Sequence, residues 1–225
     1  MSKKIFITGT GTDVGKSYIS ALVVKKMREF GLNVGYFKPV SSGNLADDEI
    51  IPLDVKFVRD FAKIELSYSQ MSAYNFIKPY SPHLSAKNEN KSVNMDTIIS
   101  KLNNLDKICD FMVVEGAGGV ICPLRYDDEK IMLLDLIKAL NLSVIIVSDA
   151  ALGAINQTGL TSFYLRQNGV DIKGVVLNNF DENCPICVDN KKMINELFGL
   201  KILSCVKRDE LSLDISKDEI LNIFN

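Results

Sequence analysis

A glycine-rich segment near the N-terminus has the residue types that bind phosphate. Residues 9–17 read GTGTDVGKS and lie between a short apolar run at 5–7 and a segment with helical periodicity. Glycines allow successive backbone N–H groups to turn toward one anion, and the start of a helix adds partial positive charge. In such a loop Lys16 reaches the β- and γ-phosphates of a nucleotide, and the Ser17 hydroxyl faces Mg²⁺. The segment predicts nucleotide binding without specifying a reaction.

The spacing of these glycines departs from the usual phosphate loop, which reads GxxxxGK followed by Ser or Thr. Here five residues separate Gly9 from Gly15, one more than in that pattern, and Thr10 stands at the strict position of the first glycine. A turn that contains Gly and Ser by chance is the alternative. The strand expected before the segment and the helix expected after it favour phosphate binding.

Two carboxylates are candidates to complete a magnesium site with Ser17, because Mg²⁺ prefers hard oxygen ligands. Glu115 follows the apolar run 111–114, which is typical of a central parallel strand, and ligands bind at the carboxyl ends of such strands. A solvated carboxylate at a strand end is the alternative for Glu115. Asp54 stands near the start of an expected helix, where the helix dipole favours any Asp. The pattern alone does not decide whether Asp54 is a Mg²⁺ ligand or only stabilises the start of a helix.

Lys38 follows the apolar run 34–37 and precedes PVSSG at 39–43. Since Pro39 cannot continue a central strand, we expect Lys38 to lie where the chain leaves the sheet. That edge carries the chemistry in open α/β sheets. An ordinary exposed lysine is the alternative.

The elements that must position these residues alternate along the chain. We expect strands at 5–7, 34–37, 111–114, 143–147, 172–177 and 201–205. We expect helices at 16–30, 52–63, 95–105, 131–140, 154–168, 189–198 and 216–224. The alternation predicts an α/β fold, with a mostly parallel β-sheet flanked by helices on both faces, in a single domain over 1–225. The segment 67–93, rich in Ser, Asn, Lys and Pro, is predicted to be a long, exposed, irregular loop.

Composition excludes several classes of protein. The 225 residues carry 26 Lys and Arg against 28 Asp and Glu, a net charge of −2, so we expect no general binding to nucleic acid. Hydrophobic residues make up 47% and charged residues 24%, which excludes a disordered chain. No run of 18 apolar residues occurs, so no membrane span is expected. The N-terminus turns polar too soon for a signal peptide, and we expect a cytoplasmic protein.

The five cysteines are odd in number and widely spread, which suggests reduced thiols. Cys184 and Cys187 form one C-x-x-C motif. A zinc site would need a second pair or two histidines, and the chain has only His83. A redox role would place the motif at the start of a helix. We expect free thiols in a loop.

Five motifs in order along most of the chain resemble the dethiobiotin synthetase family, within the larger P-loop group. They are GTGTDVGKS at 9–17, GYFKPVSSG at 35–43, SPH at 81–83, VEGAGG at 114–119 and LGAIN at 152–156. The longer phosphate loop is a feature of this family. The resemblance implies the fold of a P-loop NTPase.

The resemblance also implies a reaction. In this family 7,8-diaminopelargonate reacts with CO₂ to form a carbamate, whose oxygen attacks the γ-phosphate of ATP. The resulting carbamic–phosphoric anhydride is closed by the second amine to a cyclic urea, which gives dethiobiotin for biotin synthesis. ATP is the co-substrate and Mg²⁺ the cofactor. Lys38 and Lys16 match catalytic lysines, and Lys38 would neutralise both the carbamate and the γ-phosphate.

Site residues follow from the same motifs. The residues implied to bind the nucleotide are Thr12, Asp13, Val14, Gly15, Lys16, Ser17, Tyr18, Asp54, Glu115, Gly116, Ala117, Gly118, Asn178 and Asn179. The implied Mg²⁺ ligands are Ser17, Asp54 and Glu115. The residues implied to bind the substrate are Thr12, Lys38, Ser42, Gly118, Gly153, Ala154, Ile155 and Asn156.

The last four of these residues match a carboxylate site at the interface of a homodimer, where N–H groups at a helix start face the distal carboxylate. His83 matches the SPH motif, and we expect it to order its loop rather than act as a base. The chain departs from the family after its last strand. Residues 203–208 read LSCVKR, where a Gly and an Ile-Pro pair are typical of the adenine loop. We therefore expect weaker or less adenine-specific nucleotide binding.

The sequence argues against three other functions. A regulatory P-loop ATPase of the partitioning or division-site type, a nucleotide-switched binding module, carries a second Lys near the loop start, where this chain has Thr10 and Gly11. An amidotransferase that acts on corrinoid rings would need a glutaminase domain, for which 225 residues leave little room. A simple kinase would need no carboxylate pocket at 153–156.

Overall fold

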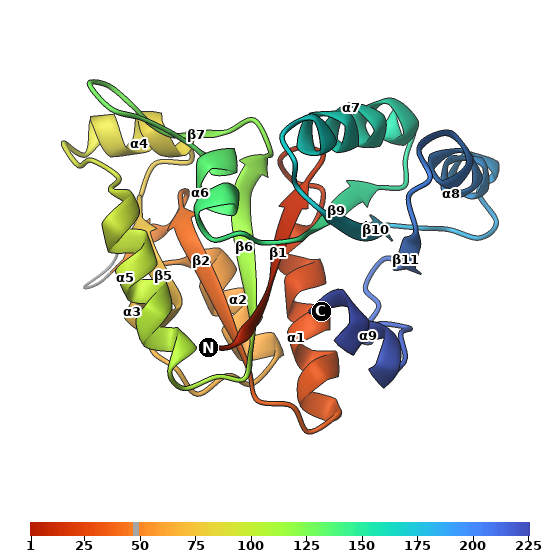
Figure 1. Cartoon of the computed structure of the whole chain (residues 1–225), viewed down its shortest axis with the longest axis horizontal. Helices are drawn as coiled ribbons and strands as arrows, with labels where there is room; N and C mark the ends of the chain where they lie inside the picture. The colour runs from red at the N-terminus through yellow and green to blue at the C-terminus, as the bar shows by residue number, and fades with distance from the viewer. Residues whose placement is uncertain (47–49) are drawn as a thin grey trace.

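The computed structural model describes residues 1–46 and 50–225, and seven of the described strands form one sheet (Figure 1). The sheet order is β11-β10-β9-β1-β6-β2-β5, and all of its strand pairs are parallel. The strands are β1 Lys3–Gly9, β2 Val34–Ser41, β5 Ser72–Asn75, β6 Phe111–Gly119, β9 Val144–Asp149, β10 Ile172–Asn178 and β11 Ile202–Cys205. The predicted α/β fold with a parallel sheet is confirmed.

Helices cover both faces of this sheet, because the strands bury side chains on both sides. On β1, Ile5 and Ile7 pack into one hydrophobic cluster and Phe6 into the other. The first cluster lies against α1 Lys16–Glu29, α2 Leu53–Phe61, α3 Tyr68–Met71 and α9 Lys217–Ile223. The second lies against α4 Pro82–Asn88, α5 Met95–Asp106, α6 Leu133–Ala139, α7 Ala154–Gln167 and α8 Pro185–Phe198.

The expected helices and strands are present with shifted ends, and the boundaries of β2, β6 and α8 change the expected position of a functional residue. β2 continues through Pro39 to Ser41, so the prediction that the chain leaves the sheet at Lys38 is wrong. Pro39 is tolerated because β2 pairs with β6 only over 34–37 and with the edge strand β5 from Lys38 onward. Glu115 likewise lies within β6 and not at the end of its strand. The helix expected from 189 begins at Pro185, which places the C-x-x-C motif at a helix start and not in the expected loop.

The segment 67–93 is not the irregular exposed loop that its composition predicts. It contains α3, the strand β5 and α4, and it buries Met71, Ser72 and Phe76 completely. β5 pairs with the second half of β2 and completes the edge of the sheet. Ser81 before Pro82 was a usable signal for α4, because Pro is favoured in the first turn of a helix.

Two small antiparallel pairs complete the described elements. They are β3 Leu45–Ala46 with β4 Ile50–Ile51, and β7 Pro123–Tyr126 with β8 Lys130–Met132. Neither pair was expected from the sequence. Among the described helices, none has both the length and the apolar character that crossing a membrane requires.

Candidate active site

The phosphate loop joins β1 to α1, and its backbone geometry explains its glycines. Gly15 caps α1 with a left-handed backbone of φ 93°, where a side chain would be strained. A Cβ at Gly15 would lie 2.1 Å from Nδ2 of Asn178, and one at Gly9 would lie 2.7 Å from Cγ2 of Val14. No side chain caps α1, and its first turn has no acidic residue. The N–H groups at this helix start therefore suit an anion.

Lys16 lies inside this loop. Its Nζ donates to the carbonyl oxygen of Gly11 at 2.7 Å, and its side chain is buried. Burial lowers the pKa of Lys16, and the nearby Lys38 lowers it further, although Glu115 and Asp54 partly oppose both effects. The Lys16 ammonium is thus held against the backbone of the phosphate loop, near the N-terminus of α1.

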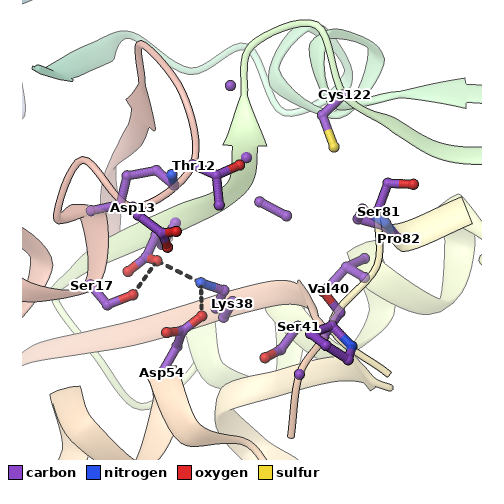
Figure 2. Close-up of a pocket in the computed structure, with 18 of the residues that line it drawn as sticks. Thr12, Asp13, Ser17, Lys38, Val40, Ser41, Asp54, Ser81, Pro82 and Cys122 are labelled. Carbon is purple, nitrogen blue, oxygen red and sulfur yellow. Dashed lines mark hydrogen bonds and ion pairs between the residues drawn. The ribbon is translucent and has the colours of Figure 1, made fainter. Parts of the chain in front are cut away.

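Lys38 and two carboxylates form an ionic cluster beside the loop, in which Lys38 and Glu115 are buried and Asp54 is partly exposed. Figure 2 shows the contact of Lys38 with Asp54. Nζ of Lys38 lies 2.6 Å from Oε1 of Glu115 and also pairs with Oδ2 of Asp54. Ser17 Oγ donates to the same Oε1 atom at 2.7 Å. The side chains come from β2, β6 and the starts of α1 and α2, which meet because β6 lies between β1 and β2. The structure thus brings together Lys38 and the three predicted metal ligands.

The surroundings of Lys38 and Asp54 stabilise the charged forms of both side chains. Glu115 is 0% exposed and Lys38 is 4% exposed. Burial alone would lower the pKa of Lys38, but attraction to Glu115 and Asp54 outweighs it and raises the pKa above its ordinary value. Burial alone would raise the pKa of Asp54, but the charge and hydrogen bond of Lys38 outweigh it and lower the pKa. Lys38 is therefore a cation and Asp54 an anion at neutral pH.

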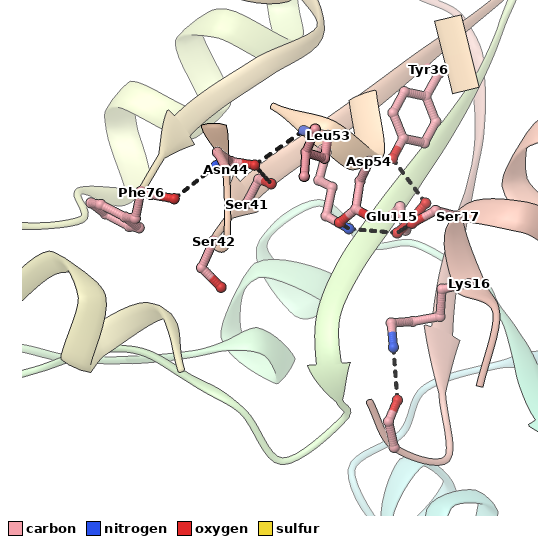
Figure 3. A network of polar contacts seen from close by, with 12 residues as sticks. Lys16, Ser17, Tyr36, Ser41, Ser42, Asn44, Leu53, Asp54, Phe76 and Glu115 are labelled. Atoms are coloured by element: carbon pink, nitrogen blue, oxygen red, sulfur yellow. Dashed lines mark hydrogen bonds and ion pairs between the residues drawn. The ribbon is translucent and has the colours of Figure 1, made fainter. Parts of the chain in front are cut away.

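Tyr36 is a member of this cluster that the sequence analysis missed. Its Oη donates to Oε2 of Glu115 at 2.9 Å, so both carboxylate oxygens have partners (Figure 3). Burial raises the pKa of the Tyr36 phenol well above its ordinary value, and the charge of Glu115 adds to this. Tyr36 stands two positions before Lys38 on β2, and alternate residues of a strand share a face. That spacing was the available signal.

Tyr36→Phe is expected to lower the free energy of unfolding by ~1.5–3 kcal/mol, because it removes a buried hydrogen bond to a charged group. Urea denaturation measures the loss. The matched control is Tyr126→Phe at the exposed end of β7, which we expect to stay within ~0.5 kcal/mol of the parent. Equal stabilities of the two variants would contradict a structural role for the phenol.

A cavity of about 830 Å³ joins the phosphate loop to this cluster (Figure 2). Ser81 and Pro82 at the start of α4 face the loop from the opposite wall, and Cys122 lies above them. The predicted site residues that line it are Thr12, Asp13, Gly15, Lys16, Ser17, Tyr18, Lys38, Ser42, Asp54, Glu115, Ala117 and Gly118. The segment 79–82, whose Ser81 and Pro82 belong to the SPH motif, and the segment 121–123 supply further walls, and neither was among the predicted site residues.

Known proteins are similar to this chain over nearly its whole length. A family model described as an AAA domain matches residues 3–214. The chain is 43% identical over 221 residues to the ATP-dependent dethiobiotin synthetase BioD of Clostridium perfringens, covering 98% of this chain and 96% of that protein. It is 44% identical over 222 residues to the BioD of Brachyspira hyodysenteriae, covering 98% and 99%. The chain belongs to the dethiobiotin synthetase family.

Solved structures share the fold of this dethiobiotin synthetase family member at low identity. The septum site-determining protein MinD from Pyrococcus horikoshii, solved with Mg-ADP, is 15% identical, with a TM-score of 0.57 over 93% of this chain and 82% of that chain. A ParA family ATPase from Chlorobium tepidum is 15% identical, with a TM-score of 0.54 over 98% and 90%. These likenesses establish a P-loop NTPase fold and carry no information about the reaction.

Some predicted residues of the dethiobiotin synthetase motifs lie outside the cavity. Val14 is buried, and Gly116 packs against Phe6 and Leu133, where a Cβ would lie 3.0 and 2.9 Å from their side chains. The segment 153–156 forms the start of α7, beyond the cavity lining. There Gly153 caps the helix with φ 97° and no side-chain cap.

Asn178 ends β10 and Asn179 follows it, and both lie outside the cavity lining. Asn178 Nδ2 donates to the carbonyl oxygen of Val14 at 3.1 Å, while its buried Oδ1 has no hydrogen-bond partner among the described residues. Asn179 Nδ2 donates to Oδ2 of Asp149 at 3.3 Å. Asn178 therefore supports the phosphate loop directly.

His83 lies in the first turn of the short helix α4. Its Nδ1 is buried and lacks a hydrogen-bond partner in the part of the chain that the structure describes. The imidazole is absent from the residues that line the cavity. α4 begins at the cavity wall, so His83 is better placed to order its segment than to act as a base. This ordering role remains a prediction.

Proposed function

We propose that the protein is an ATP-dependent dethiobiotin synthetase that converts 7,8-diaminopelargonate, CO₂ and ATP to dethiobiotin, ADP and phosphate. The observation that carries this proposal is the position of Lys38. Its buried ammonium lies on the wall of one cavity, together with the phosphate loop and three oxygen-bearing side chains. In the proposed complex the Lys38 ammonium is adjacent both to the γ-phosphate of a nucleotide bound to the phosphate loop and to the part of the cavity that faces this phosphate.

The reaction asks the protein chiefly for charge neutralisation and alignment. The carbamate oxygen attacks the γ-phosphorus and ADP leaves; the second amine then attacks the carbamate carbon and expels phosphate as the ring closes. Lys16 and the N-terminus of α1 hold the β- and γ-phosphates. Lys38 lies between the carbamate and the γ-phosphate, where its charge reduces the repulsion between two anions. Thr12, Ser42 and Gly118, which line the cavity, orient the diamine.

The donor set of the cluster fits Mg²⁺. Ser17, Asp54 and Glu115 offer only oxygen atoms beside the phosphate loop, which suits a hard cation. The described residues contain no group of three or more His, Cys, Asp and Glu that could hold a metal, so phosphate oxygens and water would complete the coordination. When bound, Mg²⁺ supplies charge neutralisation at the β- and γ-phosphates.

We further propose a homodimer that places the substrate carboxylate at residues 153–156 of one protomer, across from the cavity of its partner. The start of α7 has no side-chain cap and begins after a glycine that allows close approach. Large apolar side chains are exposed around it, namely Leu152, Leu160 and Phe163. An apolar patch of this kind is typical of an interface between protein chains.

Phe163→Asp is expected to convert the dimer to monomers and to raise the KM for the diamine, because a charge in the proposed interface is left without water or a partner. Analytical ultracentrifugation and initial-rate kinetics measure the two effects. Leu197→Asp on the exposed face of α8 is the matched control, and we expect it to remain dimeric. A dimer that survives Phe163→Asp contradicts the proposed interface.

The chain departs from its family where the adenine loop is expected, and we propose that base selectivity is correspondingly weak. Asn178→Ala is expected to weaken ATP and GTP binding equally, because the side chain supports the loop at Val14 and Gly15. Calorimetry with both nucleotides measures this, with Asn183→Ala on the exposed loop as control. A sharp preference of the parent protein for ATP over GTP would count against the prediction.

We also propose that the enzyme works in the cytoplasm, since its five cysteines are free, as is usual in a reducing compartment.

The test of the proposed function is phosphate release from ATP, which must depend on both the diamine and bicarbonate, with dethiobiotin identified by mass spectrometry. Release that depends on nucleic acid or membranes instead would favour a nucleotide-switched regulatory ATPase.

A further inference from the structure

Asn44 is a buried polar residue that lies outside the cavity lining. It directly follows the GYFKPVSSG motif at 35–43, and its side chain is 5% exposed. Burying an amide costs free energy unless the amide is hydrogen-bonded. The partners of the Asn44 amide therefore show which parts of the fold it holds together.

The Asn44 amide joins three elements (Figure 3). Its Oδ1 accepts a hydrogen bond from the Ser41 hydroxyl at the end of β2, at 3.0 Å, and one from the Leu53 N–H at the start of α2, at 3.2 Å. Its Nδ2 donates to the carbonyl oxygen of Phe76, directly after β5, at 2.9 Å. The backbone N–H of Asn44 donates to the same carbonyl oxygen at 3.2 Å. One residue thus ties the start of α2 to the ends of two neighbouring strands.

The hydrogen bond to Leu53 supplies a helix cap that the residue before the helix does not provide. The first N–H groups of a helix have no partner within the helix, and a Ser, Thr, Asp or Asn at the cap position usually accepts from one of them. α2 begins after Pro52, which makes no side-chain cap. Asn44 stands nine residues before Leu53 and provides the acceptor from outside the helix.

This contact lies one residue away from the ionic cluster. Asp54 follows Leu53 in the first turn of α2, and its carboxylate pairs with Nζ of Lys38 on β2. Between Asn44 and Leu53 the described residues form the two-residue strands β3 and β4, and a pair this short is marginal on its own. The amide is therefore a direct link between the helix start that carries Asp54 and the strand that carries Lys38.

We propose that Asn44 is a positioning residue that acts through Asp54. It holds the first turn of α2 so that the Asp54 carboxylate stays beside Lys38, on the wall of the cavity next to the phosphate loop. The inference rests on the proposed function, in which Asp54 is a ligand of Mg²⁺. Partners that orient the ligands of a metal ion typically change its affinity by ~10–100-fold when they are removed.

Calorimetric titration of the full chain with ADP tests the effect on Mg²⁺. The Kd is measured once with excess Mg²⁺ and once with EDTA, and the ratio of the two values is the gain in affinity that Mg²⁺ provides. We expect Asn44→Ala to reduce this gain by ~10-fold and to leave the Kd in EDTA unchanged, because Asn44 is absent from the cavity lining. An equal loss of affinity in both buffers would overturn the proposal, as would a parent protein that shows no gain from Mg²⁺.

A double-mutant cycle tests whether Asn44 acts through Asp54. We expect Asn44→Ala combined with Asp54→Asn to show the same gain from Mg²⁺ as Asp54→Asn alone. Losses that multiply in the double variant would overturn the proposal, because they would show two independent effects. The matched control is Asn190→Ala, which we expect to keep the gain of the parent protein. Asn190 is also buried, and its amide ties α8 to the carbonyl oxygens of Ala150 and Ala151 at 2.9 Å.

Amide hydrogen exchange followed by NMR tests the contact in the parent protein, independently of whether the variants fold. We expect the Leu53 N–H to exchange at least ~10-fold more slowly than the same amide in an unstructured peptide, because Asn44 accepts its hydrogen bond. Exchange at the peptide rate would overturn the proposal. Neither experiment needs the diamine or CO₂, so a chain that makes no dethiobiotin would count against the proposed function and leave these results to decide the role of Asn44.

Discussion

Lys38→Ala is expected to lower kcat by ~10²–10⁴ while the affinity for nucleotide is largely retained, because the charge acts mainly in the transition state. Lys38 comes from β2 and contacts Glu115 and Asp54, whereas the phosphate loop has its own lysine. As the carbamate oxygen approaches the γ-phosphate, negative charge accumulates between them. Loss of the ammonium at that point raises the barrier more than it weakens the ground state.

The Lys38 variant also leaves Glu115 and Asp54 without their cation, and an unpaired buried charge destabilises a fold. Lys38→Gln keeps a hydrogen-bond donor in the cluster and is the second variant. Thermal unfolding separates loss of structure from loss of chemistry. The matched control is Lys56→Ala, an exposed lysine of α2 whose ion pair with Asp60 contributes little. Unchanged kcat in folded Lys38→Ala or Lys38→Gln protein would remove Lys38 from the mechanism.

Lys16→Ala is expected to harm both binding and rate. Its ammonium lies within the phosphate loop, where we expect it to contact the β- and γ-phosphates in the ground state as well as in the transition state. A lost hydrogen bond to a charged group is worth ~1.5–3 kcal/mol, which corresponds to a Kd for ATP raised by ~10–10²-fold. We expect kcat to fall as well, because charge on the transferring phosphoryl group is less well neutralised.

Calorimetry with a non-hydrolysable ATP analogue measures the binding effect of Lys16→Ala, and single-turnover phosphate release measures the rate. The control is Lys25→Ala on the same helix, whose ammonium pairs with Glu29 at the surface. An unchanged Kd for Lys16→Ala would show that the loop lysine does not contact the phosphates. Together, the two lysine variants distinguish a residue that binds in both states from one that acts only as charge develops.

The sequence by itself determined the order of the elements and the place of the nucleotide loop. Helical periodicity at 16–30 and the apolar run at 111–114 are local patterns, and each corresponds to an element in the fold. The role of the loop glycines could be predicted because it is also local: the left-handed backbone at Gly15 depends on the φ angle of that residue and on its close neighbours. Local sequence is sufficient wherever the physical constraint is local.

Segment 67–93 was misread because its elements are short and gain their stability from partners elsewhere. β5 has four residues and is held by β2, and α4 has seven residues and packs into the core through Ala86. Short helices and single edge strands are marginal on their own, so their composition gives little sign of order. The segment 79–82, which lies between these two elements and includes the first residue of α4, nevertheless forms the far wall of the cavity.

Only the tertiary structure decided how the ionic cluster of Lys38, Glu115 and Asp54 is assembled. The contact of Tyr36 with Glu115 spans 79 residues of sequence, and that of Lys38 with Glu115 spans 77. Both exist because β6 lies between β1 and β2 in the sheet, an order that no local pattern encodes. The sequence identifies the side chains that can carry charge. The strand order brings them within hydrogen-bond distance of one another in a buried site, where an unpaired charge would cost free energy.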